Sequence, residues 1–412
     1  MTSCTSDNSV LKYYVYYPNN YPNYSTCPLP AVILFHGGAY NECGDFNDEG
    51  VITMCQELAY RGFVCFDVNY RVGVLADAVD IVPGSNPPVN YTTAQQVLAI
   101  YRACQDARGA IRSIIQRQSD EGTGTINDPY RIDVNNLIIG GISAGSLIAM
   151  NAVYYQQQQM LDVIFGTSIK LAGTTNGVLG PMDADYYYGS PTIEYFSKIR
   201  CVFNMWGGMF IPKSNINSIG SFFSSDTYLP PIISFQGDLD DVFNIHQQGV
   251  YYSNTPLKQF DPTKESKCLI GSNKTFTPKQ LNKDPDLYTI GASNIYNTFT
   301  GSSVFSELYV DCEMHHGLDC GGCPGDHDNP AKDKTCNACL FQSDFGTGLS
   351  TYADVYAYIA GREATFYQAI IGGKTGFINK TKFVECDNNR NKCTNTSDNT
   401  GTCADPPPCN ND

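Results

Sequence analysis

The stretch that decides the fold is "LIIGGISAGSLIA", residues 137–149. An apolar run with the composition of a buried strand leads through small residues into a second apolar run that favours a helix. Ser143 stands at the centre of the small residues, in the spacing Gly141-x-Ser143-x-Gly145. That spacing is typical of a nucleophile on a sharp strand-to-helix turn, because small neighbours let the helix pack close to the strand. The chain holds 37 glycines, so the motif needs support from other segments.

Outward from this stretch, strand-like and helix-like segments alternate. Helical spacing is found at 48–61, 93–118 and 352–373. Strand composition is found at 11–18, 31–38, 62–73, 198–208, 231–238 and 304–314. The alternation predicts an α/β fold, a mostly parallel sheet with helices on both faces. A chain of 412 residues that is 42% hydrophobic can bury a large core, as one enlarged domain or as two domains.

Chemically reactive residues follow three of the predicted strands. Ser143 follows one, the acidic segment "QGDLDDV" (236–242) follows a later one, and "HHG" (315–317) follows the last. The carboxyl ends of parallel strands meet at one edge of a sheet, where loops converge. The sequence therefore predicts a serine, an acid and a histidine, in that chain order, at this edge.

With these segments the chain resembles a serine esterase of the α/β-hydrolase superfamily, in the branch of carboxylesterases and hormone-sensitive-lipase-like enzymes that carries an HGG oxyanion loop. The resemblance covers roughly residues 11–373. The chain differs from the family pattern at Gln236, where the family often has a histidine. The segment between the proposed acid and the proposed histidine is also longer than is usual in the family. The matching segments, in order, are "LPAVILFHGGAY", "GFVCFDVNYRVG", "QDARGAIR", "YRIDVNNLIIGGISAGS", "PIISFQGDLDDV" and "HHGL".

The resemblance implies an α/β-hydrolase fold and a catalytic triad of Ser143, Asp240 and His316. A serine hydroxyl is a weak nucleophile, so a histidine must accept its proton and a carboxylate must hold that histidine in the right tautomer. The family pattern H-G-x-x-D-x-x-V selects Asp240, with Asp238 and Asp241 as alternatives. The H-G pair selects His316, with His315 as the alternative.

The resemblance also implies an oxyanion hole. Its donors would be the backbone N–H groups of Gly38, Ala39 and Ala144, aimed at charge that appears only in the transition state. His36 of the HGG motif is expected to be structural rather than catalytic. The mechanism requires no cofactor and no metal.

We expect a catalytic domain at 1–373 and a cysteine-rich extension at 374–412. The catalytic domain is predicted to contain an insertion at about 255–303 and a cysteine-rich loop at about 312–342. The extension is polar and cannot build a core without cross-links.

Seventeen cysteines and five glycosylation sequons predict a secreted, disulfide-bonded glycoprotein. The first residues have neither the basic nor the apolar region of a signal peptide, so a signal peptide, if one exists, has been removed or left out of this sequence. Two CxxC pairs have the spacing of a zinc ribbon, which leaves zinc as the alternative to disulfides at Cys320, Cys323, Cys336 and Cys339. The sequons begin at Asn23, Asn90, Asn273, Asn379 and Asn395.

Charge and hydropathy narrow the choice of partners. A net charge of −15 repels nucleic acid, and no apolar run reaches the length of a membrane span. The expected partner is a small-molecule or polymer-borne ester. Three function classes stay open, namely a carboxylic-ester hydrolase, a peptidase on the same scaffold and a non-catalytic adhesion or binding module. Neither the ester nor the oligomeric state follows from the sequence.

Overall fold

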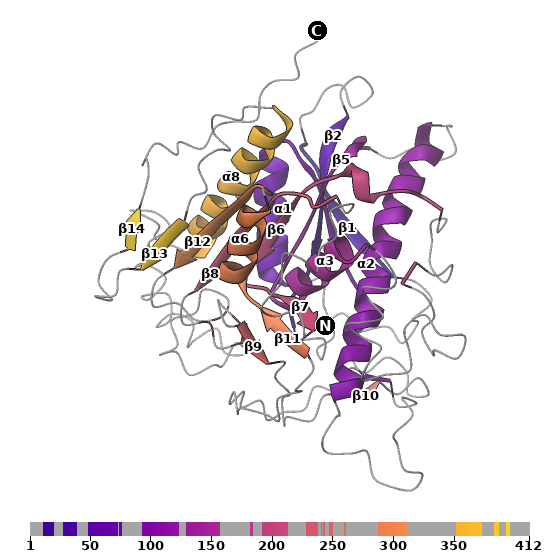
Figure 1. Ribbon diagram of the computed structural model, residues 1–412. Helices are drawn as coiled ribbons and strands as arrows, with labels where there is room; N and C mark the ends of the chain where they lie inside the picture. The colour runs from indigo at the N-terminus through magenta and orange to yellow at the C-terminus, as the bar shows by residue number, and fades with distance from the viewer. Residues whose placement is uncertain are drawn as a thin grey trace, which may run out of the picture.

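A nine-stranded sheet runs through the middle of the protein, with helices on both faces (Figure 1). The computed structural model describes residues 11–19, 28–38, 48–72, 74–75, 93–122, 129–156, 182–183, 192–212, 228–237, 240, 242–243, 247–249, 259–260, 287–302, 304–311, 316, 352–372, 383–386 and 393–395. The strands of the sheet, in spatial order, are β1 (Tyr13–Tyr16), β3 (Val64–Val68), β2 (Leu29–Phe35), β5 (Ile132–Ile142), β6 (Ile199–Met205), β8 (Ile232–Gly237), β12 (Ser306–Asp311), β13 (Phe383–Cys386) and β14 (Cys393–Asn395).

The sheet is parallel from β3 to β13 and antiparallel only at its two edges. Strands β3 and β8 are buried along their whole length, and β2 is buried at all but one residue. Such burial explains why these segments read as continuous apolar runs, because a parallel sheet has no face in contact with water. The predicted α/β class with a mostly parallel sheet is confirmed, and its strand order is that of an α/β-hydrolase fold.

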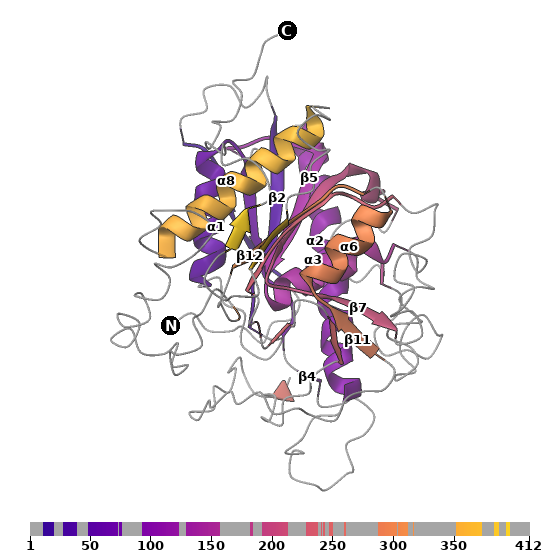
Figure 2. The same ribbon diagram turned by 60° about the vertical axis from the view of Figure 1, so that its left-hand side comes forward.

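Helices form a layer on each face of the sheet (Figure 2). On one face α1 (Glu49–Tyr60) packs against α8 (Tyr352–Ile371), and both share a core cluster with the sheet. The other face is covered by α2 (Thr93–Gly122), α3 (Ala144–Tyr154) and α6 (Ala292–Gly301). Every residue of α3 is buried, which is why this helix has an apolar composition all round.

The connections that follow β2 and β5 leave on opposite faces of the sheet. Strand β2 leads through α1 on one face to β3, whereas β5 leads through α3 on the opposite face to β6. Neighbouring strands whose connections leave on opposite faces open a crevice between their carboxyl ends. The "HGG" loop and Ser143 follow these two strands, so the topology itself places them at the crevice.

Small pieces of structure lie outside the main sheet. β7 (Met209–Pro212), β11 (Leu287–Ile290) and β9 (Gln247–Gly249) form an antiparallel sheet. A parallel pair joins β4 (Val74–Leu75) to β10 (Gln259–Phe260), and the 3-10 turn η1 (Phe196–Lys198) precedes β6. The predicted insertion at 255–303 contains β10, β11 and α6, and the predicted extension at 374–412 contains β13 and β14. The structure does not test these predicted boundaries further.

Four of the described cysteines form no disulfide, although the sequence predicts a disulfide-bonded protein. Cys55, Cys65, Cys104 and Cys201 are free thiols, each fully buried in the core. They pack as small apolar side chains under the helices, and burial raises the thiol pKa of Cys104 to about 12. These four cysteines therefore do not indicate whether the protein folds in an oxidising compartment. No helix among the residues listed above combines the length and the apolar composition of a membrane span.

Candidate active site

Ser143 lies on a strained turn between β5 and α3. Its backbone has φ 55° and ψ −119°, a conformation that a residue with a side chain rarely adopts. The two motif glycines make the turn possible. A Cβ at Gly145 would lie 2.0 Å from the carbonyl oxygen of Phe35, and one at Gly141 would lie 2.4 Å from the carbonyl carbon of Gly145. The strand-to-helix turn predicted from Gly-x-Ser-x-Gly is therefore present.

The hydroxyl of Ser143 does not cap the helix that it precedes. A serine before the first turn of a helix ordinarily accepts a bond from a first-turn N–H group. Here no such bond forms, and the Ser143 Oγ lies 2.6 Å from Nε2 of His316. The backbone N–H of Ser143 donates to the carbonyl of Met205 at 2.9 Å, which ties the turn to β6. The strained backbone thus turns the hydroxyl away from its helix and toward the histidine.

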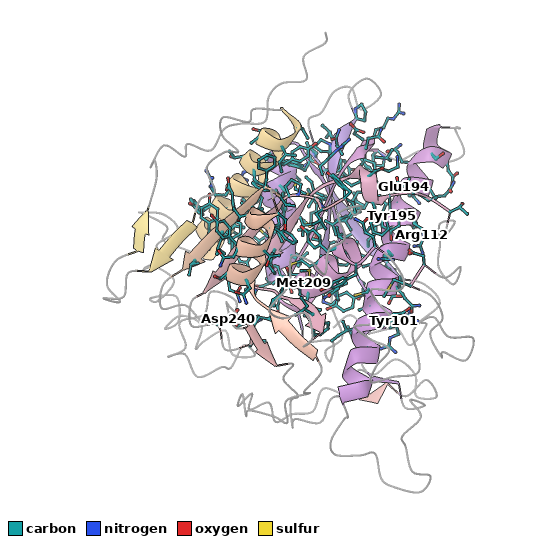
Figure 3. The ribbon with its side chains drawn as sticks, in the orientation of Figure 1. Tyr101, Arg112, Glu194, Tyr195, Met209 and Asp240 are labelled. Carbon is teal, nitrogen blue, oxygen red and sulfur yellow. The ribbon has the colours of Figure 1, made fainter. Side chains whose placement is uncertain are left out.

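His316 lies between Ser143 and a buried carboxylate. Its Nδ1 is 3.1 Å from both carboxylate oxygens of Asp240, whose side chain is fully buried. The imidazole is one-fifth exposed, and the ring of Phe243 lies beside it with a centroid distance of 5.7 Å. Figure 3 labels Asp240 at the lower end of the sheet. Serine, histidine and aspartate therefore form one hydrogen-bonded chain from the ends of three strands.

The carboxylate of Asp240 is held by neutral donors. Its Oδ1 accepts the backbone N–H groups of Val242 and Phe243 at 2.9 and 2.8 Å. Its Oδ2 accepts Nε2 of Gln236 at 3.1 Å. A buried carboxylate is stable only when hydrogen bonds replace its lost water, and these bonds supply that replacement. They also direct the remaining lone pairs toward His316.

The "HGG" loop lies against Ser143 and is anchored to α1. A Cβ on Gly37 would be 3.4 Å from the Cβ of Ser143, which shows how closely the loop approaches the turn. The N–H of Gly37 donates to Oδ2 of Asp48 at 3.2 Å, and Oδ1 of Asp48 accepts the N–H groups of Gly50 and Val51. Asp48 is the N-cap of α1, so one carboxylate fastens both the helix and the loop.

Tyr70 supports the loop from behind. Its hydroxyl donates to the carbonyls of His36 and Gly37 at 2.9 and 3.2 Å, and its ring stacks on His36. Burial raises the pKa of Tyr70 well above its usual range, so the hydroxyl stays protonated and remains a donor. The ring nitrogens of His36 lie 2.7 Å from the carbonyl of Gly37 and 3.3 Å from Oδ1 of Asn69. These contacts agree with a structural role for His36.

Beside Asp48, β3 carries a second carboxylate, Asp67, with an unusual environment. It is buried, and neither of its oxygens has a hydrogen-bond partner among the residues that the structure describes. Burial raises the pKa of Asp67 to about 7, and the negative charge of Asp48 adds to the rise. The folded protein therefore binds a proton on Asp67 at pH values where the unfolded chain has released it.

This difference predicts a pH-dependent stability. The contribution of Asp67 is fully present below about pH 4 and is lost as the pH rises to about 7. Asp67→Asn should raise the free energy of unfolding by about 2 to 3 kcal/mol at pH 8 and much less at pH 4.5. Chemical denaturation at the two pH values measures the effect. Glu49→Gln, the same kind of change at an exposed site, is the control, and an equal gain at both pH values would contradict the assignment.

The structure brings the predicted Ser143, His316 and Asp240 together, with Gly38 in the loop that follows β2 and Ala144 at the start of α3. Gly38 has φ 103°, a conformation that glycine adopts readily. Several other predictions lie outside the described residues. They concern Ala39, the alternatives Asp238, Asp241 and His315, and the cysteines Cys320, Cys323, Cys336 and Cys339.

Two residues of the site were not predicted from the sequence. Asp48 carries a recognisable signal, because an aspartate directly before a helical pattern is a preferred N-cap. That signal indicates the helix but not the bond to Gly37. Gln236 stands out in the sequence only as a difference from the family that the chain resembles, and no local pattern reveals that it contacts Asp240.

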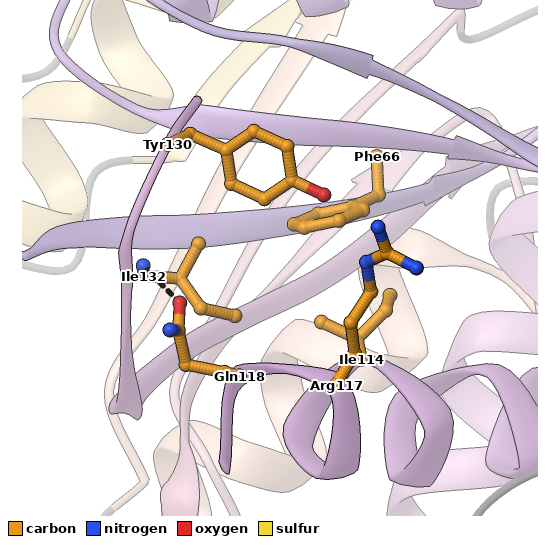
Figure 4. A pocket seen from close by; sticks show the side chains of 6 residues that line it. All are labelled: Phe66, Ile114, Arg117, Gln118, Tyr130 and Ile132. Atoms are coloured by element: carbon orange, nitrogen blue, oxygen red, sulfur yellow. Dashed lines mark hydrogen bonds between the residues drawn. The ribbon is translucent and has the colours of Figure 1, made fainter. Parts of the chain in front are cut away.

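Two other features near the sheet are structural. Arg108 and Arg112 of α2 both pair with Asp183, and Tyr195 donates to the same carboxylate. Figure 3 labels Arg112 and Tyr195 of this cluster. Arg108 also donates to carbonyls at and beyond the end of α3, so this cluster locks α2 to α3. A small cavity lies between α2 and the sheet, at the end of β5 opposite to Ser143, with room for about one water molecule (Figure 4). It is lined by Phe66, Ile114, Arg117, Gln118, Tyr130 and Ile132.

Comparison with known proteins finds no matching family model and no matching curated protein. Solved structures of Thermogutta terrifontis esterase 2 are similar to the chain. Its apo form is 15% identical, with 92% of this chain and 94% of that chain covered and a TM-score of 0.42. The form phosphonylated by cyclosarin is 14% identical, with 92% and 96% covered and a TM-score of 0.43. The propionate-bound form is 15% identical, with 82% and 90% covered and a TM-score of 0.38.

Proposed function

We propose that this protein is a serine carboxylic-ester hydrolase of the α/β-hydrolase superfamily, in the branch with an HGG oxyanion loop. One observation carries the proposal, namely the continuous hydrogen-bonded chain from the Ser143 hydroxyl through His316 to the buried Asp240. Such a chain has the geometry by which a hydroxyl becomes a nucleophile. The nucleophile follows β5 at the carboxyl edge of the parallel sheet, the edge at which ligands of α/β folds bind.

In the first half of the reaction, Ser143 Oγ attacks the ester carbonyl carbon while its proton passes to Nε2 of His316. The imidazolium then gives this proton to the alcohol oxygen as the carbon–oxygen bond breaks, which leaves an acyl-enzyme. In the second half, a water molecule attacks the acyl carbon and gives its proton to the same nitrogen. That proton returns to Ser143 Oγ, and the carboxylic acid leaves. Asp240 accepts a bond from Nδ1 throughout and stabilises the positive ring.

Negative charge that develops on the carbonyl oxygen would be stabilised by backbone N–H groups of Gly38, Ala39 and Ala144. Ala144 begins α3, and the positive end of a helix dipole favours an anion there. The bond from Gly37 to Asp48 would keep the loop at a constant distance from Ser143. A preorganised loop needs no rearrangement when the charge appears.

Hydrolysis of aryl esters with graded acyl chains tests the proposal. The wild-type protein should hydrolyse at least the short-chain esters and should form a stable adduct with an organophosphorus reagent. Peptide mass spectrometry should place the adduct on Ser143. Absence of both turnover and adduct would refute the proposal and favour the binding module. Faster cleavage of peptide amides than of matched esters would instead favour the peptidase.

We further propose that the chain acts outside the cell, on a small or polymer-borne ester, and that cysteines beyond the core form disulfides. The sequons and the cysteine count support this. Strand register adds one specific pair, because Cys386 of β13 stands directly opposite Cys393 of β14. Residues opposite each other in antiparallel strands have Cα atoms about 4.5 to 5.5 Å apart, within the range that a disulfide spans.

The expected disulfide can be tested in protein made by a secretory host. After alkylation without reductant, the peptides that contain Cys386 and Cys393 should be recovered linked. The four core cysteines serve as an internal control, since they should be alkylated only after unfolding. Alkylation of Cys386 and Cys393 as free thiols would contradict the pairing. A parallel zinc analysis distinguishes disulfides from metal at the two CxxC pairs.

A further inference from the structure

A buried glutamine connects the carboxylate of the triad to the rest of the fold. Gln236 is the penultimate residue of β8 and is completely buried. Its Nε2 donates to Oδ2 of Asp240 at 3.1 Å and also to the carbonyl oxygen of Phe243. Both hydrogens of the amide are therefore used, one on the carboxylate and one on the loop that carries it.

The orientation of this amide is determined by its third bond. Oε1 of Gln236 accepts the backbone N–H of Ala292, the first residue of α6, at 3.0 Å. A backbone N–H can only donate, so the oxygen must face α6 and the NH₂ group must face Asp240. Gly291, the N-cap of α6, has no side chain to cap the helix, so the glutamine performs that task as well.

Without this glutamine, Oδ2 of Asp240 would keep only its contact with His316 among the groups that the structure describes. The backbone groups of Val242 and Phe243 bind only Oδ1, whereas Oδ2 is held by Gln236 and by the shared contact with His316. Both oxygens lie 3.1 Å from Nδ1 of His316, which requires the carboxylate plane to be held on both sides. We propose that Gln236 is a positioning residue that sets the plane of the Asp240 carboxylate and thereby the orientation of His316.

This inference rests on the proposed ester hydrolase function and adds a residue to its machinery. Gln236→Met keeps the length of the side chain and removes both donors. We expect kcat to fall about 10- to 100-fold with KM nearly unchanged, because a small displacement of a catalytic group lowers the rate of the chemical step. The matched control is Gln118→Met on α2. Gln118 accepts the backbone N–H of Ile132, at the end of β5 opposite to Ser143, so this variant also removes an acceptor of a backbone N–H and should leave kcat unchanged.

Gln236→Glu keeps nearly the same side-chain shape as glutamine and provides a second test if Gln236→Met does not fold. It replaces a donor by a carboxyl group beside Asp240, and added negative charge there favours the protonated imidazole. The acidic limb of the pH profile of kcat/KM should therefore move to higher pH by about one unit. A limb that stays in place while only the thermal stability falls would contradict the contact between this side chain and Asp240.

A measurement without substrate separates this inference from the proposed function. The Nδ1 proton of His316, bonded to Asp240, should give a far-downfield proton resonance in the wild-type protein. That resonance should shift or broaden in Gln236→Met and stay unchanged in Gln118→Met. An unchanged resonance, together with kcat within twofold of wild type, would overturn the positioning role. Absence of ester turnover in the wild-type protein would refute the hydrolase proposal and leave the resonance test valid.

Discussion

Ser143→Ala is expected to remove nearly all ester turnover, by on the order of 10⁴-fold or more. The substitution deletes the oxygen that lies 2.6 Å from Nε2 of His316 and leaves no other nucleophile in the hydrogen-bonded chain. His316→Ala should cost a similar factor, because no group would then accept the proton. Asp240→Asn should cost somewhat less, since it changes the tautomer of the imidazole rather than removing the base. Steady-state kinetics with a short-chain aryl ester measures all three.

The losses of activity caused by the three substitutions should not be additive. A Ser143→Ala/His316→Ala double variant should be no slower than either single variant, because both side chains belong to one proton-transfer unit. Circular dichroism of each variant checks that the fold is retained. If Ser143→Ala kept more than a tenth of wild-type activity with an intact fold, the proposed mechanism would be wrong.

Gly145→Ala is expected to have the second-largest effect. Its new Cβ would lie 2.0 Å from the carbonyl oxygen of Phe35 and 2.5 Å from that of His36, so the backbone of α3 would have to move away from β2. We expect a loss of about 3 kcal/mol or more in the free energy of unfolding, as in severe overpacking. Activity should fall at least about 100-fold, because the helix that moves carries Ser143 at its start.

The chain offers a matched control for this glycine. A Cβ at Gly301, in the last turn of α6, would have no heavy atom within 4 Å from any described residue beyond its chain neighbours and its own helix backbone. Gly301→Ala should therefore be neutral, or stabilising by up to about 1 kcal/mol, because alanine is the better helix former. Denaturant unfolding compares the two variants. Equal effects of the two substitutions would show that the close packing of Gly145 is not what requires a glycine there.

Much of the fold follows from local patterns. The buried strands of the parallel sheet are apolar runs, and α1, α2 and α8 lie within a few residues of their predicted ranges. Part of the turn at Ser143 is also local, because a side chain at Gly141 would collide with the backbone of Gly145 and Ser146, only four and five residues further along. The sequence thus predicts the α/β class and the nucleophile from neighbouring residues.

Helix α6 shows where local patterns fail. Its sequence, "ASNIYNTFTG", is rich in serine, asparagine and threonine, which are weak helix formers, and it was predicted as part of an insertion. It is helical because Ile295 and Phe299, one turn apart, are buried against the sheet, and Phe299 packs edge-on against Tyr154. Tertiary packing therefore outweighs the local preference.

By itself the sequence determined the strands, most of the helices and the strained turn that presents Ser143, because each depends on residues close together in the chain. Only the tertiary structure decided which carboxylate meets His316, that Gln236 and Asp48 hold the acid and the loop, and that four cysteines are core thiols. The physical reason is the order of strands in the sheet. β2, β5, β8 and β12 come from distant parts of the chain, and their ends become neighbours only when the sheet forms.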